Sequence, residues 1–259
     1  MDLNLKDKVI IVTGGSKGIG LGIVESLVHE GARPVIITRN KSSVDDVIED
    51  FEKKGIEVFY ALAELTDPEQ CKRAVAEVVE KYGRIDGLVN NAGVNDSVGL
   101  ETGNYNDFMQ SLKRNVAHYY SMAQYALPEL KKTKGAIVNI GSKTADTGQG
   151  GTSGYAAANG GRNALTREWA VELLPYSIRV NALIVAECYT PLYDKWISTF
   201  PDKEERLADI RKKIPFENRM TTAEEIGDTV AFLLSSKSSH TTGQLLYVDG
   251  GYAHLDRSL

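Results

Sequence analysis

Glycines gather where the first apolar segment of the chain ends. Residues 9–12 are all apolar, Gly14, Gly18 and Gly20 follow them, and a helical pattern begins shortly afterwards. A glycine turn between a buried strand and a helix lets the backbone approach a diphosphate, and the helix N-terminus offers free N–H groups and a partial positive charge. Glycines also close ordinary turns, but this spacing after a first strand favours a dinucleotide site. The residues expected to bind it here are Gly14, Ser16, Lys17, Gly18, Ile19 and Gly20.

The end of the second apolar segment predicts which dinucleotide fits. An acidic residue there would accept a hydrogen bond from the ribose 2′-OH of NAD, whereas a basic residue accommodates the 2′-phosphate of NADP. This chain has Thr38, Arg39 and Asn40 at that point, with no carboxylate among them. The planar guanidinium of Arg39 suits a phosphate, and Lys17 could converge on it. The alternative is that both are solvated surface charges. We expect NADP to be preferred, with NAD as the other candidate.

Short apolar segments alternate with longer helical patterns, which is typical of βαβ units around a parallel sheet. Most of these segments are apolar at consecutive positions, as in strands covered by helices on both faces. Right-handed crossovers would wind them into a doubly wound α/β sheet of about seven strands, a Rossmann fold. The segment 186–219 interrupts the alternation and is expected to form a helical flap over the substrate. The expected strands are 9–12, 34–38, 57–61, 87–90, 136–140, 179–184 and 245–248, and the helices lie near 19–30, 43–54, 68–82, 105–131, 153–174 and 222–235.

Composition and charge narrow the class of protein. The 259 residues contain no Pro-rich or Gly/Ser-rich linker, so we expect one domain covering 1–259. The net charge of -5 argues against non-specific nucleic-acid binding, which needs a basic surface. No apolar run approaches the roughly 20 residues that span a bilayer. Cys71 and Cys188 lie far apart without metal-ligand spacing, so we expect no metal site and a reducing, cytoplasmic location.

Further motifs follow the glycine turn in a fixed order. Asn-Asn-Ala-Gly at 90–93 comes after the fourth expected strand, and Asn115 lies inside a long helical pattern. Ser142 follows the fifth strand, and Tyr155 comes thirteen residues later. Together with the glycine turn, this order resembles the short-chain dehydrogenase/reductase family over essentially the whole chain, down to Tyr-Val-Asp-Gly-Gly at 247–251. The resemblance implies an NAD(P)-dependent oxidoreductase that transfers a hydride between the nicotinamide and a small-molecule substrate.

The resemblance also implies a role for each matched residue. Tyr155 would be the general acid/base that exchanges a proton with the substrate oxygen, and Ser142 would hydrogen-bond and orient that oxygen. Asn115 would hold a water molecule in a proton relay. On the cofactor side, the resemblance places Glu64 and Leu65 near the adenine, where the family usually has an aspartate at position 64. It places Asn91, Ala92 and Gly93 along the adenine ribose, and Thr190 at the nicotinamide carboxamide.

One position departs from the family's Tyr-x-x-x-Lys motif, because Asn159 stands four residues after Tyr155. Residues four apart share a helix face, so Asn159 is expected beside the phenol and the nicotinamide ribose. In the family, the lysine binds ribose hydroxyls and its charge lowers the pKa of the tyrosine. Asparagine brings no charge, so alcohol oxidation is expected to be impaired near neutral pH. Lys143 and Arg162 are candidate replacement cations, but neither occupies the lysine position.

Several stretches resemble the sugar-oxidising branch of the family that includes L-fucose dehydrogenases. The resemblance implies a secondary alcohol or the hemiacetal of an L-fucose-like aldose as substrate. Asn95, Asp96, Gln149 and Glu187 are expected to bind sugar hydroxyls, and Trp196 could stack on a pyranose face. Alternatively, Trp196 is a core or interface aromatic and Glu187 a solvated loop carboxylate. The stretches are 91–96, 141–145, 147–150, 190–193 and 240–243.

The resemblance further implies a homotetramer built through the long helices near 105–131 and 153–174. The alternative to an enzyme is a dinucleotide-binding pseudoenzyme or regulatory subunit with little turnover. Asn159 favours that alternative, whereas Ser142, Tyr155 and Asn115 favour an enzyme.

Overall fold

Seven parallel strands in the order β3-β2-β1-β4-β5-β6-β7 form the centre of the computed structural model, which describes residues 2–255. The strand order reverses between β1 and β4, and ligands of such sheets bind in the crevice outside the carboxyl ends of the strands at this point. The predicted doubly wound α/β fold of about seven strands is therefore confirmed. Met1 and residues 256–259, which the single-domain prediction also covers, lie outside the described residues.

The strand boundaries agree with the predicted ones to within two residues. The strands are β1 (Val9–Thr13), β2 (Arg33–Thr38), β3 (Phe59–Leu62), β4 (Gly87–Asn90), β5 (Ala136–Ser142), β6 (Arg179–Val185) and β7 (Leu245–Val248). The helices are α1 (Gly18–His29), α2 (Lys41–Lys53), α3 (Pro68–Tyr82), α4 (Tyr105–Leu112), α5 (His118–Thr133), α6 (Ser153–Glu172), α7 (Pro191–Ile197), α8 (Lys203–Lys212) and α9 (Ala223–Leu234).

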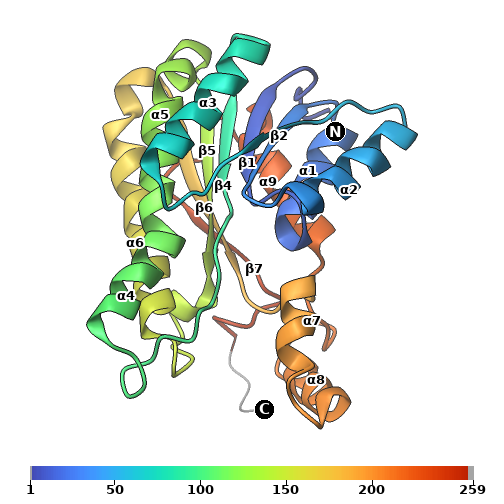
Figure 1. Cartoon of the computed structure of the whole chain (residues 1–259), viewed down its shortest axis with the longest axis vertical. Coiled ribbons are helices and arrows are strands. Elements are labelled where there is room, and N and C mark those ends of the chain that lie inside the picture. Colours follow the sequence, from blue (N-terminus) through green and yellow to red (C-terminus); the bar gives the residue numbers. More distant parts are fainter. Residues whose placement is uncertain (1, 256–259) are drawn as a thin grey trace.

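Helices cover both faces of the sheet, so the strands between them carry consecutive apolar residues (Figure 1). One core lies between the sheet and α3, α5 and α6, and a second lies between the sheet and α1, α2 and α9. In the second core, α1 and α9 touch at Gly22 and Gly227. A Cβ on Gly227 would lie 2.5 Å from the carbonyl oxygen of Gly22, so this approach requires glycine. The contact fixes the position of α1, whose N-terminus follows the glycine turn.

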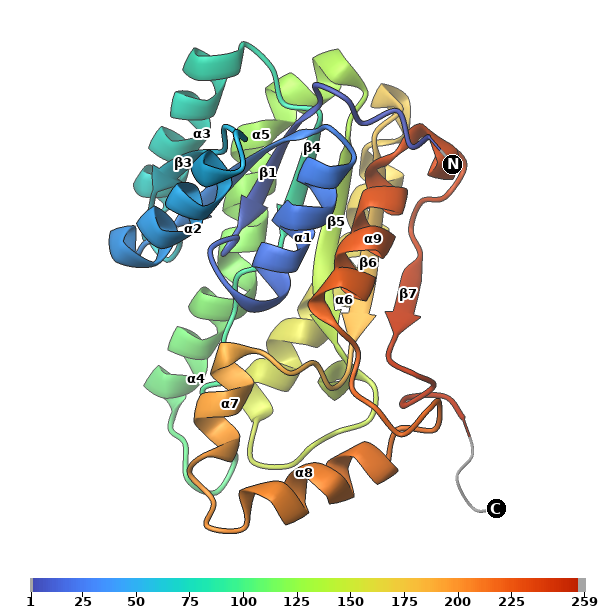
Figure 2. The same ribbon diagram turned by 90° about the vertical axis from the view of Figure 1, so that its right-hand side faces the viewer.

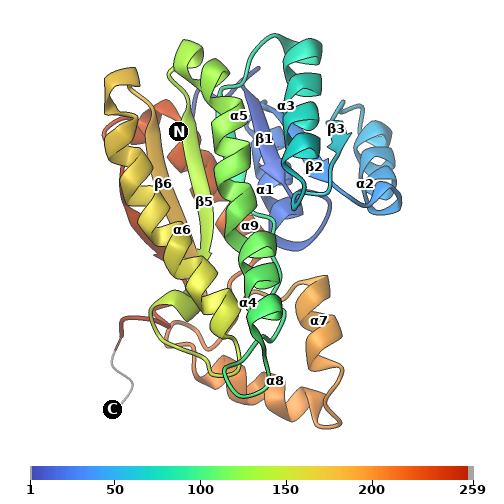
Figure 3. The same cartoon turned by 60° about the vertical axis from the view of Figure 1, so that its left-hand side comes forward.

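The helix predicted near 105–131 is observed as α4 and α5, which continue into each other through a π-helical turn at Lys113–Ala117 (Figure 3). Asn115 lies in this turn, and its backbone carbonyl accepts a hydrogen bond from Nε of Arg162 at 2.6 Å. Its side-chain oxygen accepts the N–H of Val94 at 2.8 Å. Such turns are frequent at functional sites. Here the turn directs Asn115 toward the loop after β4.

The segment 186–219 contains α7 and α8, which lie beyond the carboxyl ends of the strands (Figure 2). A small apolar core of its own holds this segment together. The members of the small core are Ile197, Leu207, Ile214 and Met220.

Within residues 2–255, no helix has both the length and the apolar character needed to cross a membrane.

Candidate active site

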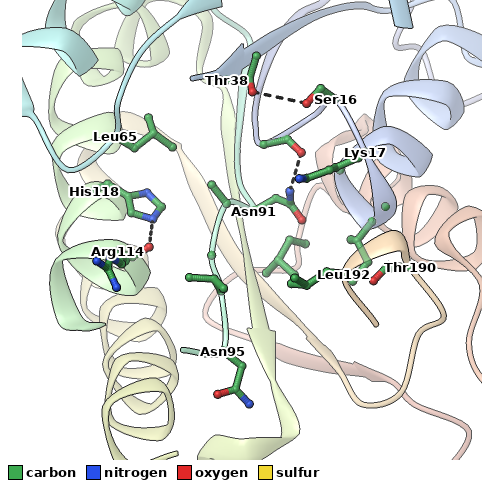
Figure 4. A pocket seen from close by; sticks show the side chains of 18 of the residues that line it. Ser16, Lys17, Thr38, Leu65, Asn91, Asn95, Arg114, His118, Thr190 and Leu192 are labelled. Atoms are coloured by element: carbon green, nitrogen blue, oxygen red, sulfur yellow. Dashed lines mark hydrogen bonds between the residues drawn. The ribbon is translucent and has the colours of Figure 1, made fainter. Parts of the chain in front are cut away.

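A cavity of about 720 Å³ opens at the carboxyl ends of the strands, where the strand order reverses (Figure 4). Its wall combines the glycine turn, the end of β2, the loop after β4, the end of β5 and the start of α6. The structure therefore brings together every residue that the sequence assigned to the cofactor. These lining residues are Gly14, Ser16, Lys17, Gly18, Ile19, Gly20, Arg39, Glu64, Leu65, Asn91, Ala92, Gly93 and Thr190.

The glycine turn forms a cradle that only a glycine backbone allows. Gly14 has a φ of 68°, in the left-handed region. A Cβ on Gly20 would lie 2.2 Å from the carbonyl oxygen of Gly14. No side chain caps the N-terminus of α1, so its first N–H groups stay available to an anion. The residues present thus fit the diphosphate of a dinucleotide.

Hydrogen bonds tie the end of β1 to the loop after β4. Thr13 accepts the backbone N–H groups of Asn91 and Ala92 through Oγ1, at 2.9 and 3.1 Å. The side-chain amide of Asn91 donates to the carbonyl oxygen of Thr13 at 2.9 Å. These bonds hold the two sides of the crevice at a fixed separation.

Hydroxyl groups and one guanidinium gather at the end of β2. Oγ of Ser16 lies 3.5 Å from Oγ1 of Thr38 and 3.2 Å from Oγ of Ser43. Arg39 donates to Glu64 at 3.1 Å, and its side chain is 74% exposed. Burial alone would raise the pKa of Glu64, but bonds from Thr66 and Arg39 lower it overall. An exposed pair of this kind contributes little stability, so Arg39 can turn to another anion at small cost.

Ser142 and Tyr155 line the same cavity from neighbouring elements. Ser142 is the last residue of β5, and Tyr155 lies in the first turn of α6. The Ser142 hydroxyl accepts from the N–H and the hydroxyl of Thr144, at 3.3 and 3.1 Å. Its own proton is therefore free for donation into the cavity.

Asn115 and Asn159 lie behind this wall, fully buried and outside the set of lining residues. The amide nitrogen of Asn159 donates to the carbonyl oxygen of Tyr155 at 2.9 Å. Its amide oxygen accepts from Nη1 of Arg162 at 3.0 Å. The carbonyl oxygen of Asn115, which also bonds Arg162, is thus engaged as well. The water-holding role of Asn115 and the cofactor-side role of Asn159 stay predictions.

The expected substrate residues are separated. Asn95 and Asp96 line the cavity, whereas Gln149, Glu187 and Trp196 are not among the lining residues. The roles of all five in substrate binding stay predictions. Glu187 forms a largely buried ion pair with Lys143. The alternative interpretation as a solvated carboxylate is therefore wrong. Trp196 is 44% exposed, and its ring packs edge-on against its aromatic neighbours Tyr193 and Phe200.

Sequence reasoning did not assign His118 or Arg162 to the cavity wall, although both line it. Arg162 stands seven residues after Tyr155 on one helix, and this spacing of two turns is the signal that could have placed both on one face. His118 is buried, and its Nε2 lies 3.0 Å from the carbonyl oxygen of Arg114. Burial first, and the charge of Arg162 second, lower the pKa of His118 to about 3. His118 is therefore uncharged at neutral pH.

Both cysteine thiols are free and buried. Burial raises the pKa of Cys188, which lines the cavity, to about 12, and that of Cys71 to about 11. The thiolate is the reactive form of cysteine, so Cys188 does not serve as a nucleophile near neutral pH.

Comparison with known proteins gives consistent matches over nearly the whole chain. The family model described as enoyl-(acyl carrier protein) reductase matches residues 14–253. The 3-oxoacyl-[acyl-carrier-protein] reductase FabG of Thermotoga maritima is 33% identical over 250 residues, covering 96% of this chain and 99% of that protein. The L-fucose dehydrogenase of Bos taurus is 32% identical over 245 residues, covering 94% and 88%.

Two solved structures share both the fold and its length. The Cj0485 dehydrogenase superposes with a TM-score of 0.94 at 45% identity, covering 100% of this chain and 99% of the other. The ligand-free aldohexose dehydrogenase (AldT) of Thermoplasma acidophilum superposes with a TM-score of 0.89 at 28% identity, again covering 100% and 99%.

The buried, uncharged His118 predicts a measurable pH dependence of stability. Unfolded His118 takes up a proton near pH 6.5, whereas the folded protein resists protonation until about pH 3. Between these values the unfolded state binds more protons, so the free energy of unfolding falls as the pH is lowered, by at most about 1.4 kcal/mol per pH unit for this group. Urea unfolding between pH 4 and 7 should show a shallower dependence in His118→Gln than in the natural protein. Parallel curves for the two proteins would contradict this account of His118.

Proposed function

The chain belongs to the short-chain dehydrogenase/reductase family and is an NAD(P)-dependent oxidoreductase, and from this premise we propose that it oxidises a secondary alcohol or the hemiacetal hydroxyl of an L-fucose-like aldose with NADP. One observation carries the proposal: Ser142 and Tyr155 line the same cavity as the glycine turn. A substrate held there can therefore meet the acid/base groups and the dinucleotide together. Turnover is expected, rather than the mere binding of a pseudoenzyme.

In this proposal Ser142 donates its free proton to the substrate oxygen and holds that oxygen toward Tyr155. Tyr155, in its ionised form, accepts the hydroxyl proton of the substrate as the alcohol becomes a carbonyl. The bound nicotinamide supplies the acceptor for the hydride. For carbonyl reduction the same residues act in reverse, with Tyr155 starting as the protonated phenol.

Polar groups at the edge of the cavity support a sugar as substrate. Asn95, Asp96 and Arg114 line this edge and offer amide, carboxylate and guanidinium groups. Ser111 donates to Asp96 at 2.8 Å, which fixes the carboxylate in place. Several such groups can bind several hydroxyls, and this suits an aldose better than an alkyl chain. The names of the L-fucose dehydrogenase and aldohexose dehydrogenase relatives point in the same direction.

The proposed activity predicts NADPH formation from L-fucose or related aldoses. Tyr155→Phe removes the acid/base group and should lower kcat by about 10²-fold or more. Tyr60→Phe is the matched control, because it removes one phenolic hydroxyl that bonds Asp45 away from the cavity. Steady-state assays on aldoses, simple secondary alcohols and a 3-oxoacyl thioester would test the substrate class. Activity confined to the thioester would reject the sugar assignment, and cofactor binding without any turnover would support the pseudoenzyme.

The pH dependence of the same assay tests the expected effect of Asn159. Asparagine adds no charge in direct contact with the phenol, and tyrosinate is scarce near neutrality without such a contact. We therefore expect slow oxidation at pH 7 that rises toward pH 10. A rate that is already maximal at pH 7 would contradict this expectation.

The proposed preference for NADP rests on the hydroxyl groups of Ser16, Thr38 and Ser43 and on Arg39 beside them. Arg39→Ala should raise the KM for NADP about tenfold or more, the usual scale for one charged hydrogen bond, and leave the KM for NAD nearly unchanged. Arg33→Ala is the matched control, because Arg33 is also exposed and paired with a carboxylate, but at the opposite end of β2. An equal loss for both cofactors would reject the preference.

We also propose a homotetramer assembled through α4, α5 and α6. Large apolar side chains are exposed on these helices, which supports burial against another copy. Sedimentation equilibrium should give four times the chain mass of 28.3 kDa, and a monomeric mass would contradict the assembly. The exposed apolar side chains on these helices are Tyr105, Met109, Tyr120 and Val171.

The free thiols of Cys71 and Cys188 support a reducing location such as the cytoplasm.

A further inference from the structure

Arg162 buries a guanidinium group next to the candidate acid/base residue. Its side chain belongs to α6, and the residue is 2% exposed. The group donates to the carbonyl oxygens of Asn115 and Ile140, at 2.6 and 3.0 Å, and to the amide oxygen of Asn159 at 3.0 Å. All three acceptors are neutral, and no carboxylate within residues 2–255 forms an ion pair with it. A buried charge without a counter-charge destabilises the folded protein. The presence of Arg162 here therefore points to a functional role.

The third nitrogen of the Arg162 guanidinium is directed at the cavity wall. Its Nη2 is buried and has no hydrogen-bond partner in the described part of the chain. A Cβ on Gly93 would lie 2.7 Å from this nitrogen, so the guanidinium occupies the space that glycine leaves open. The Cζ atom lies 5.9 Å from the centroid of the Tyr155 ring and 4.3 Å from that of Tyr119. The charge therefore sits between the loop after β4 and the two phenols.

We propose that Arg162 supplies the positive charge that the family's lysine would bring, and that it favours the ionised form of Tyr155 from one helical turn beyond the usual position. Arg162 is a positioning residue in this assignment, since it acts on the reaction through Tyr155. The inference rests on the proposed function of the site. A guanidinium does not lose its proton in a protein, so this charge persists over the whole working pH range. It leaves the effect of Asn159 as a deficit relative to a cation in direct contact with the phenol.

This arrangement requires a neutral side chain between Tyr155 and Arg162, and Asn159 provides it. Its amide group bonds the backbone of Tyr155 on one side and Arg162 on the other. A lysine at position 159 would bring an ammonium group against the guanidinium, and like charges at this separation repel. A lysine at 159 and an arginine at 162 are therefore alternatives. Arg162 also occupies the carbonyl oxygen of Asn115, the residue that the resemblance expects to hold a water molecule.

Other titratable groups around Tyr155 do not provide the charge. From α5, Tyr119 donates to the carbonyl oxygen of Ile140 at 3.0 Å, and burial raises its pKa, so it stays neutral. His118 on the same helix is uncharged, because burial lowers its pKa to about 3. Lys143, next to Ser142, is paired with Glu187, which cancels its charge. Of these groups, Arg162 alone carries a charge that no carboxylate neutralises.

The test compares Arg162→Met with the natural protein by the pH dependence of kcat with NADP saturating. An opposite charge at this range commonly shifts an ionisation by about one pH unit or more. We therefore expect kcat for oxidation to fall at least about tenfold at pH 7 and much less at pH 10. A residue that only supports the fold would lower kcat by the same factor at every pH. A pH profile in Arg162→Met that keeps its shape would overturn the proposal.

Arg179→Met is the matched control for losing a half-buried arginine that bonds backbone carbonyl groups. Arg179 also donates to backbone carbonyl oxygens, those of Leu233, Leu234 and Ser235, but it lies at the start of β6, away from the cavity. This variant should lose stability in urea and keep the pH profile of kcat. If it shifts the profile as Arg162→Met does, the shift reports damaged packing and the proposal fails.

A further test places the positive charge at position 159, where the family has lysine. Asn159→Lys alone should not raise the rate at pH 7, because Arg162 still occupies the neighbouring position. The double variant Asn159→Lys/Arg162→Met, which holds one cation, should recover most of the activity that Arg162→Met loses. A gain of about tenfold in Asn159→Lys with Arg162 intact would show that Arg162 does not replace the lysine.

A readout that needs no turnover separates this inference from the proposed function. Tyrosinate absorbance of the NADP complex, taken as the difference between each protein and its Tyr155→Phe partner, follows the ionisation of one phenol. Its midpoint should lie about one pH unit or more higher in Arg162→Met than in the natural protein. This shift with no activity on any substrate would reject the substrate assignment alone, and an unshifted midpoint would reject the role of Arg162.

Discussion

Burial of the parallel sheet on both faces is the constraint on which the rest of this structure depends. Strands covered by helices on either side can hold polar groups in their interior only where those groups bond one another. Asn139 in β5 shows this, since it accepts from Asn90 and donates to Thr166, both at 3.0 Å, in full burial. Other polar chemistry is displaced to the carboxyl ends of the strands. The glycine turn, the hydroxyl groups at the end of β2 and Tyr155 therefore line one cavity, although they are distant in sequence.

The features that follow from local spacing could be predicted from the sequence. The turn between Gly14 and Gly20 is defined by neighbouring residues, and Ser142 is placed by the end of its own strand. Consecutive apolar residues in β1, β4 and β5 report the two covered faces directly. These patterns depend on backbone conformation and on burial, and both restrict which residue types can follow one another in the sequence. For this reason the sequence could predict the fold, and it could predict that the glycine turn and the end of β5 line one cavity.

Features that depend on where a long side chain ends could not be placed in this way. Lys143 and Glu187 are far apart in sequence, and their pairing withdraws Glu187 from the cavity. Trp196 packs on its neighbours in the flap, where one sequence says little about orientation. The π-helical turn around Asn115 lies inside a continuous helical segment, and no residue type in the sequence marks its position. For Glu187 and Asn115 the contact partners come from other elements.

Arg162 shows why a catalytic motif is better interpreted as a set of charges and acceptors than as one position. Its guanidinium is planar with donors in fixed directions, so it fits only if acceptors stand at matching points. The π-helical turn directs the Asn115 carbonyl group toward the guanidinium, and Asn159 supplies an amide oxygen in place of an ammonium group. Gly93, which has no side chain, leaves room for the guanidinium. Considered alone, Asn159 is the loss of a charge. Considered with these three partners, it is one part of a local rearrangement in which the charge has moved one helical turn along α6 and remained beside Tyr155.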